Sequence, residues 1–351
     1  MRSFLTGLLF LGCTATLPAQ WLKIKTPGIP RQADGKPALT APVPRAPDGK
    51  PDLSGLWGTE DNTYGINLTA DLKAGDVLPW AEEVYKKRLE ALDKDTPATR
   101  CLPGGPTAIL GAQYRIIQSP NVTGILYGDG AYRQIFTDGR DLPKDPNPTW
   151  WGYSVGHWEG DTLVVESAGF NDRSWLDYAG HPHTEDLRVT ERFTRADFGH
   201  MQLQFILDDP KTFKHPVSVS LAVNYVPDTE MLEYVCNENE KDYGHLVGKA
   251  SDDVKADVKV AARVLSRYAG NYQMEEGGKM KAAISASGDQ LMFSIGGKGG
   301  VPLTTLSDTS FFFPGGFPLD FILDDKGTVT HLLLHAPCGD FKFVRTETAG
   351  K

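Results

Sequence analysis

Two histidines separated by a single residue, His181 and His183, lie among acidic residues in segment 177–186. In an extended segment, side chains two positions apart point the same way, so both imidazoles could bind one metal ion through ring nitrogens. Such a site needs a further ligand from elsewhere in the chain. The candidates for that ligand are Asp177, Glu185, His157 and His245.

The same segment could transfer protons without a metal. A histidine beside a carboxylate can act as an acid or a base near neutral pH. His181 or His183, together with Asp177 or Glu185, would form such a pair. The reactions open to it are hydrolysis, elimination and isomerisation. The alternative is a polar loop whose histidines cap backbone groups.

Aromatic side chains concentrate around this segment and favour a third possibility, the binding of a small molecule. Pockets commonly combine an apolar wall with a few convergent polar groups. The candidates for contacts with a sugar-like or aromatic ligand are Trp150, Trp151, Tyr153, Trp175 and Tyr178, with Arg140 or Arg173 for polar contacts. The competing interpretation is that these rings fill a core, which we prefer for Trp158 because it lies on a predicted strand.

We rank small-molecule binding first among the functions that these residues support. The alternative is an enzyme that uses Asp177, His181, His183 and Glu185, with or without a metal at the two histidines. A structural or interaction role is the third possibility. No motif specifies a cofactor, since no glycine pair precedes a helix with the Lys-Ser/Thr of a phosphate-binding loop.

The composition limits the partners. The chain has 351 residues and a net charge of -9, with a sequence pI near 5.4. An acidic balance without a basic tract argues against a nucleic acid as partner. This length allows two or three domains, and 40% hydrophobic residues allow a sizeable core.

The first 19 residues predict a signal peptide. Arg2 supplies the positive charge, residues 4–12 form a short apolar core, and Ala19 ends a plausible cleavage site. We therefore expect an exported protein, periplasmic or extracellular. Cys13 offers an alternative lipid anchor. The apolar core is too short to span a bilayer, and no later stretch could do so.

Three cysteines remain after cleavage, and an oxidising compartment permits disulfides. Cys101 and Cys236 belong to the same predicted domain, so we expect them to pair. Cys338 falls in another domain and is expected to be a buried free thiol. The alternative is three unpaired thiols.

The elements that must position these residues are mainly strands. Residues 20–50 form a Pro-rich linker or arm, and one helix begins at Pro79. Alternating patterns then predict strands over residues 114–118, 122–127, 132–136, 153–158, 162–167, 188–193, 202–207, 217–223 and 231–235. A second helix is predicted over residues 253–266, and a second run of strands starts at Tyr268.

Many short strands with turns at regular spacing predict a mainly β protein. We expect an antiparallel barrel or sandwich with one or two packed helices over residues 51–255. A small β-barrel is expected to follow over residues 256–351.

Two parts of the chain resemble known protein families. The C-terminal motifs LSRYAGNYQM, DQLMFSIGG, PLTTLSDTSFFF and LDFILDDKGTVTHLLLH resemble a small lipocalin-like barrel that is often appended to bacterial serine hydrolases of the beta-lactamase type. The resemblance covers about residues 262–347 and implies a fold without catalytic residues. The hydrolase's own Ser-x-x-Lys and Tyr-x-Asn layout does not precede it here.

The larger part of the chain, about residues 51–245, resembles an uncharacterised exported family of soil bacteria. The matching motifs are PDLSGLW, CLPGGP, IFTDGR, GYSVGHWEGDTLVVES, GHPHTEDLRVTERF and EYVCNEN. This resemblance implies export and a β-rich fold, and it supplies no mechanism.

Overall fold

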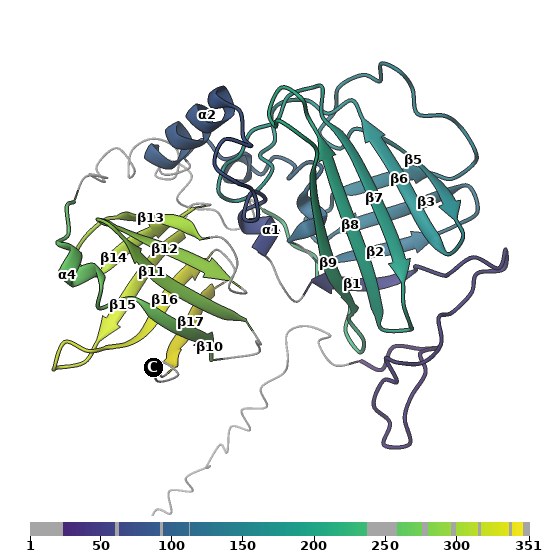
Figure 1. Cartoon of the computed structure of the whole chain (residues 1–351). Coiled ribbons are helices and arrows are strands. Elements are labelled where there is room, and N and C mark those ends of the chain that lie inside the picture. Colours follow the sequence, from purple (N-terminus) through teal and green to yellow (C-terminus); the bar gives the residue numbers. More distant parts are fainter. Residues whose placement is uncertain are drawn as a thin grey trace, which may run out of the picture.

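The computed structural model describes residues 24–59, 63–91, 94–111, 113–236, 258–275, 280–295, 300–314, 317–336 and 339–346. Within these ranges the strands form two closed barrels, one after the other along the chain (Figure 1). Of the two architectures expected for the first domain, a barrel or a sandwich, the structure shows a barrel. The predicted signal peptide, Cys13, His245 and Cys338 lie outside the described residues.

The first barrel contains nine strands that pair in chain order and close between β9 and β1. They are β1 (Gly55–Thr59), β2 (Tyr114–Gln118), β3 (Val122–Tyr127), β4 (Tyr132–Phe136), β5 (Tyr153–Glu159), β6 (Thr162–Ala168), β7 (Arg188–Arg195), β8 (His200–Asp208) and β9 (Val217–Tyr225). Neighbours are antiparallel except β4 and β5, which are parallel. The long connection from residue 137 to residue 152 makes this parallel pairing possible.

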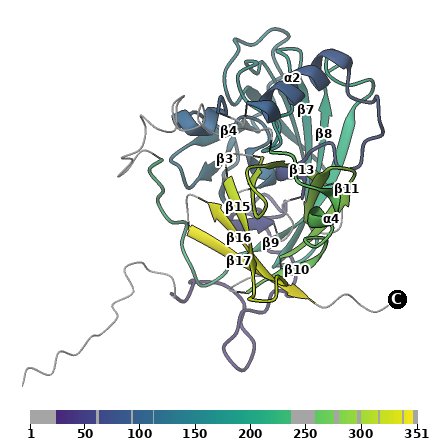
Figure 2. The ribbon, with the colours of Figure 1, turned by 90° about the vertical axis from the view of Figure 1, so that its left-hand side faces the viewer.

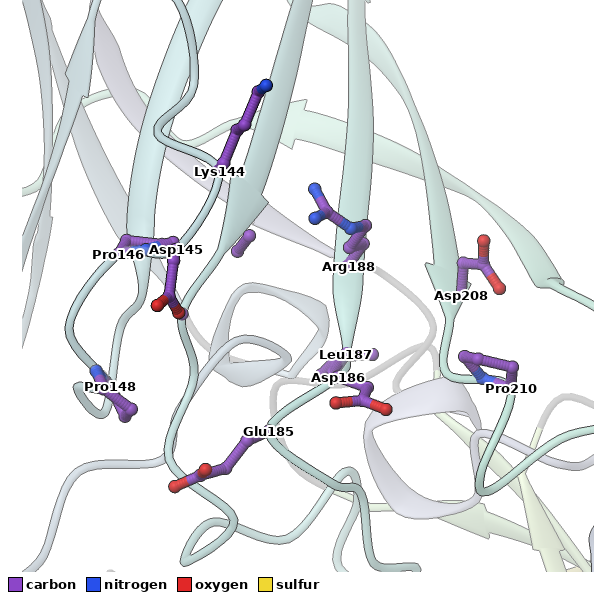
Figure 3. Close-up of a pocket in the computed structure, with 12 residues that line it drawn as sticks. Lys144, Asp145, Pro146, Pro148, Glu185, Asp186, Leu187, Arg188, Asp208 and Pro210 are labelled. Atoms are coloured by element: carbon purple, nitrogen blue, oxygen red, sulfur yellow. The ribbon is translucent and has the colours of Figure 1, made fainter.

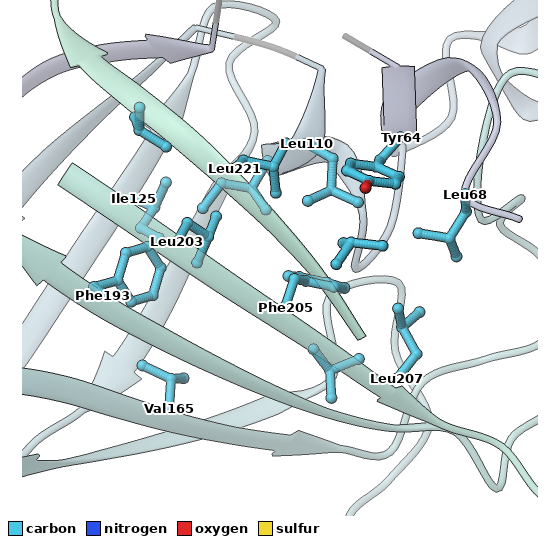
Figure 4. Packing of buried hydrophobic residues seen from close by; sticks show 14 of the residues in the cluster. Tyr64, Leu68, Leu110, Ile125, Val165, Phe193, Leu203, Phe205, Leu207 and Leu221 are labelled. Carbon is cyan, nitrogen blue, oxygen red and sulfur yellow. The ribbon is translucent and has the colours of Figure 1, made fainter. Parts of the chain in front are cut away.

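The alternation that predicted these strands reflects burial inside the barrel. Every second residue of β8, among them Leu203, Phe205 and Leu207, is fully buried, and its neighbours are more exposed. Figure 4 shows how these side chains meet Ile125 and Phe193 from other strands. Side chains with a period of two thus fill one common core.

The predicted strand over residues 231–235 is wrong. β9 already pairs with β1, so the barrel is closed before this segment begins. Leu232, Tyr234 and Val235 are exposed, and the segment forms no strand. Its alternating apolar residues imitate a strand, but no sheet edge remains for it to join.

An ion pair lies buried in the interior of the first barrel. Arg133 on β4 donates two hydrogen bonds to the Glu191 carboxylate on β7, one of them at 2.9 Å. Its Nε and Nη2 also donate to the hydroxyls of Ser154 and Ser167, on β5 and β6. Four neighbouring strands therefore share one polar network, and every member is buried.

The second barrel contains eight strands that also pair in chain order and close between β17 and β10. They are β10 (Gly270–Met274), β11 (Lys281–Ser287), β12 (Gln290–Ile295), β13 (Val301–Thr305), β14 (Ser310–Phe313), β15 (Phe317–Leu323), β16 (Val329–Ala336) and β17 (Gly339–Thr346). Aromatic rings fill its core. Tyr268 stacks on Phe321 with ring centroids 4.2 Å apart, and Phe311 meets Phe321 edge-on.

The helix predicted before this barrel is shorter than expected. Only α4 (Ala262–Leu265) is helical in the described part of residues 253–266. Residues 258–261 are not helical, and residues 253–257 lie outside the described residues. No described helix is long and apolar enough to cross a membrane.

Two helices of the N-terminal part contact the second barrel. The predicted helix at Pro79 is confirmed as α2 (Pro79–Glu90), and α1 (Thr63–Ile66) lies between the barrels (Figure 1). The Thr63 hydroxyl donates to the Ile295 carbonyl at 2.9 Å. Ile66 and Tyr85 pack against the core of the second barrel. In the perpendicular view the second barrel stands in front of the first (Figure 2).

The described part of the Pro-rich arm lies against the first barrel. The sequence Arg-x-x-Asp-Gly-Lys-Pro occurs twice, and in each copy the arginine donates to the glycine carbonyl and closes a small turn. Arg31 then pairs with Asp228, and Arg45 pairs with Asp161. The repeat thus attaches the arm at two points.

Replacing Arg133 by Met should lower the free energy of unfolding by about 3–5 kcal/mol, because the Glu191 charge would stay buried without a partner. The double variant Arg133→Met/Glu191→Leu should recover most of this loss. Urea denaturation measures both. Arg192→Met is the matched control on β7, because Arg192 pairs with the exposed Glu159 and such pairs contribute less than about 1 kcal/mol. Equal losses for Arg133→Met and the control would contradict the buried network.

Candidate functional site

Most of the candidate residues lie on the segment between β6 and β7, residues 169–187, which presents two faces. Ser174, Asp177, His181 and His183 are buried on the inner face. Arg173 and Glu185 are exposed on the outer face. We predicted one site from these residues, whereas in the structure the buried and the exposed residues face different sides of the segment.

The Asp177 carboxylate holds the inner face together. One oxygen, Oδ1, accepts hydrogen bonds from the backbone amides of Gly180 and His181 at 2.9 and 3.0 Å. The other, Oδ2, accepts from the amide of Leu68 at 2.8 Å and lies 2.6 Å from His181 Nδ1. His181 and Asp177 are therefore in direct contact, and the same carboxylate fixes the loop to the segment after α1.

The Nε2 atom and one face of the His181 ring also contact the protein. Its Nε2 lies 3.3 Å from the Thr69 hydroxyl. Tyr85 of α2 stacks on the imidazole with ring centroids 4.2 Å apart and planes 11° apart. Arg88 of α2 donates to the Gly180 carbonyl at 2.8 Å. These contacts bury the ring and place it beneath α2.

His183 forms a separate pair with a residue that sequence reasoning missed, Ser174. Its Nε2 lies 2.7 Å from Ser174 Oγ, and its Nδ1 lies 3.1 Å from the Thr184 carbonyl. A carbonyl only accepts, so Nδ1 carries the proton and Nε2 accepts the serine hydroxyl. Burial lowers the pKa of His183 below its usual value and favours this neutral form. A serine in a loop nine residues from a histidine carries no sequence signal that would have identified it.

The geometry does not bring the two histidines together as metal ligands. Three of the four ring nitrogens form hydrogen bonds with protein groups, and the fourth, His181 Nε2, lies 3.3 Å from the Thr69 hydroxyl; these neighbours differ for His181 and His183. His157, one candidate for a further ligand, lies 3.5 Å from Glu159 on a strand. The residues that the structure describes include no group of three or more His, Cys, Asp or Glu that could hold a metal. Among the described residues, the His-x-His pair is therefore not arranged as a metal site, and His245, another candidate ligand, lies outside them.

The aromatic candidates do not line one pocket. Trp151 stacks on Tyr127 and packs against the core of the first barrel. Tyr153 stacks on Phe136, and its hydroxyl accepts a hydrogen bond from Arg140 at 2.8 Å. Trp151 and Tyr153 thus have structural partners within the first barrel.

The two other rings have different neighbours. Trp175 is buried beneath the Arg88 guanidinium, whose carbon is 4.4 Å from the ring centroid. Tyr178 is 43% exposed and lies against Phe317 of β15. Of the residues predicted to contact a ligand, Arg173 and Trp150 line a hollow described for this chain.

Two adjoining hollows occur on the outer face of the segment, and we call them together the rim groove. One has a volume of about 430 Å³ and the other about 480 Å³. Both are lined by Pro148 and Glu185. The first also includes Lys144, Asp145, Asp186, Arg188 and Asp208 (Figure 3). The second includes Thr149, Trp150, Asn171, Asp172 and Arg173.

The predicted disulfide is confirmed. Cys101 and Cys236 are bonded, with Cα atoms 5.6 Å apart. The bond joins the segment before β2 to the segment after β9, 135 residues later. It also holds one end of segment 102–107, which covers Ser174: Gly105 is so close that any side chain there would collide with Ser174 Oγ.

His183 should make the stability of the protein fall at acidic pH. The unfolded chain binds a proton at this imidazole near pH 6.5, whereas the folded state has a lowered pKa because of burial and resists protonation. The free energy of unfolding should therefore fall as the pH drops from about 7 to 5, and the fall should be smaller in His183→Gln. The charged groups near this imidazole are Asp209 and Asp172, which raise its pKa, and Arg88, which lowers it.

Urea denaturation at a series of pH values measures this slope. His335→Gln provides a control of opposite sign, because hydrogen bonds with Asp340 and Asp320 raise the pKa of His335. That histidine stabilises the fold below its unfolded pKa, and the contribution is lost as the pH rises through the folded pKa. Its removal should steepen the loss at low pH. A steeper loss in His183→Gln as well would contradict the assignment of a neutral His183.

The C-terminal part of the chain is similar to a known protein family. Residues 255–351 match a family model described as "Domain of unknown function (DUF3471)". The match spans the described strands of the second barrel and agrees with a C-terminal module. A comparison with curated proteins finds no match.

Proposed function

We propose that this protein is exported and binds a polar, sugar-like small molecule in the rim groove of the first barrel. The observation that carries the proposal is that three distant segments converge there. The connection from β4 to β5 supplies residues 144–150, the connection from β6 to β7 supplies residues 169–187, and the β8 end supplies Asp208 and Pro210. Loops at the mouth of a β-barrel are a common place for a ligand.

The lining favours a ligand with many hydroxyl groups. Trp150 is half-buried and offers a flat ring, and sugars present C–H faces that pack on such rings. Arg173 and Asn171 can donate hydrogen bonds, and Glu185 and Asp172 can accept them. Donors and acceptors that line the same hollow suit neighbouring hydroxyls, each of which both donates and accepts.

The same lining disfavours a purely aromatic ligand. Such a ligand needs apolar walls on more than one side, and Trp150 is the one aromatic side chain among the residues that line the two hollows. The other aromatic residues that the sequence suggested for this purpose, Trp151, Tyr153, Trp175 and Tyr178, do not line the groove. We therefore retain the sugar-like class and set the aromatic class aside.

Two features support export. The N-terminal segment combines one positive charge with a short apolar core and a plausible cleavage site. The disulfide between Cys101 and Cys236 is of the kind that persists in oxidising compartments. An exported protein of this kind meets free saccharides outside the cytoplasm.

Titration with glucose, galactose, xylose and their β-linked disaccharides, followed by NMR of backbone amides, tests this proposal. At least one saccharide should shift the amides of residues 148–150 and 171–173. Arg173→Ala and Trp150→Ala should each weaken binding about tenfold or more, the equivalent of about 1.4 kcal/mol. The matched controls are Arg263→Ala and Tyr132→Ala, both exposed and outside the groove. They should bind like the unsubstituted protein. Shifts caused only by phenol or benzoate, or no shift in the groove, would contradict the proposal.

A further inference from the structure

We propose that Ser174 and His183 form a nucleophile and general-base pair that hydrolyses carboxylic esters. The pair is independent of ligand binding in the rim groove, since neither residue lines it. The Ser174 Oγ to His183 Nε2 distance of 2.7 Å is that of a serine hydroxyl whose proton can pass to an imidazole. Positioned pairs of this kind are the basis of acyl transfer by serine enzymes.

The surroundings of His183 keep the imidazole in the form that a base requires. The Thr184 carbonyl holds the proton on Nδ1, so the lone pair of Nε2 faces the serine. Thr184 is fixed in turn, because its amide and its hydroxyl both donate to Asp209, at 2.7 and 2.9 Å. Asp209 therefore supports the orientation of the base as a positioning residue.

The carbonyl group that binds His183 Nδ1 also indicates the substrate class. In a triad a carboxylate stabilises the imidazolium that forms when the base takes a proton, whereas here a neutral carbonyl occupies that place. The pair should therefore activate serine less strongly than a full triad does. Esters, whose alkoxide or phenoxide leaving groups depart more easily than amines, fit such a nucleophile better than amides.

The chemical steps follow from the pair. Ser174 Oγ attacks the ester carbonyl carbon and passes its proton to His183 Nε2. The tetrahedral intermediate collapses, the carbon–oxygen bond to the alcohol breaks, and the alcohol leaves with the proton from His183. Water then attacks the acyl carbon and gives its proton to His183 Nε2. The bond between this carbon and Ser174 Oγ breaks, His183 returns the proton to Oγ, and the carboxylic acid is released.

Access to Ser174 depends on segment 102–107. Gly105 adopts a positive φ of 74° and lies directly over the serine hydroxyl. The backbone carbonyl of Trp150 lies nearby. Because Gly105 has no side chain, the cover at this point is a single methylene. An ester reaches Ser174 when this short segment moves aside.

The second histidine provides an internal comparison. His181 Nε2 lies 3.3 Å from the Thr69 hydroxyl, a longer contact, and that hydroxyl donates its proton to Asn67 Oδ1 at 2.9 Å. The proton of Thr69 therefore does not point to the imidazole. Thr69 should be unreactive although it also contacts a histidine.

An alkyl fluorophosphonate, which modifies activated serines, tests the proposal on the full-length protein. Mass spectrometry of the intact protein and of its peptides should find one adduct, on Ser174 and not on Thr69. Labelling should be absent in Ser174→Ala and at least about 100-fold slower in His183→Gln, because a positioned base contributes about 10²–10⁴-fold. Thr69→Val should label at the rate of the unsubstituted protein. Hydrolysis of p-nitrophenyl acetate should follow the same order.

The site of modification in the unsubstituted protein decides the matter even if a variant fails to fold. No adduct at Ser174, under conditions in which a known serine esterase is fully modified, would overturn the proposal. An unchanged labelling rate in folded His183→Gln would also overturn it. Saccharide binding is measured separately by NMR, so failure of the groove and failure of this pair give different results.

Discussion

Four hydrogen-bond donors that converge on the Asp177 carboxylate fix the arrangement of the whole site. Three are backbone amides, from Leu68, Gly180 and His181, and the fourth is the His181 ring. Carboxylates that accept several such bonds are strongly held in place. The contact closes a tight loop and joins it to the segment after α1. This carboxylate thus contributes strongly to the division of residues 171–186 into an inner and an outer face.

This constraint extends to both barrels. The backbone amides of Tyr178 and Ala179 donate to the carbonyls of Gly65 and Ile66, so the loop is also bound directly to α1. Ala179 is then buried in the core of the second barrel, beside Tyr85 of α2. The same loop that lines the rim groove therefore also packs against the C-terminal barrel. The rim groove and the contact between the barrels therefore share one structural element.

The sequence was sufficient where local pattern determines structure. Alternation with period two located the strands from Tyr114 to Tyr225 to within two residues at each end, because each strand faces one filled core. The disulfide followed from the presence of Cys101 and Cys236 in one predicted domain. The strand predicted over residues 231–235 failed, because closure by β1 and β9 depends on pairing that a local pattern does not contain.

The site was harder to predict for the same reason. The contact between Asp177 and His181 is local, four residues apart, and could be anticipated. The partners that complete the site come from distant segments: Leu68 and Thr69 on one side, and Gly105 on the other. Aromatic composition alone suggested one pocket, but Trp151 and Trp175 each fill a different part of the structure.

Hydrogen exchange of Asp177→Asn tests the central role of this carboxylate most directly. The new amide group would present its own N–H to a donor on one side, so the loop should lose its anchor. Backbone amides of residues 65–69 and 176–183 should then exchange at least about tenfold faster, while those of β8 and β12 keep their protection. Asp186→Asn, an exposed control paired with Lys211, should leave all of them unchanged. Equal exchange in Asp177→Asn and this control would contradict the account.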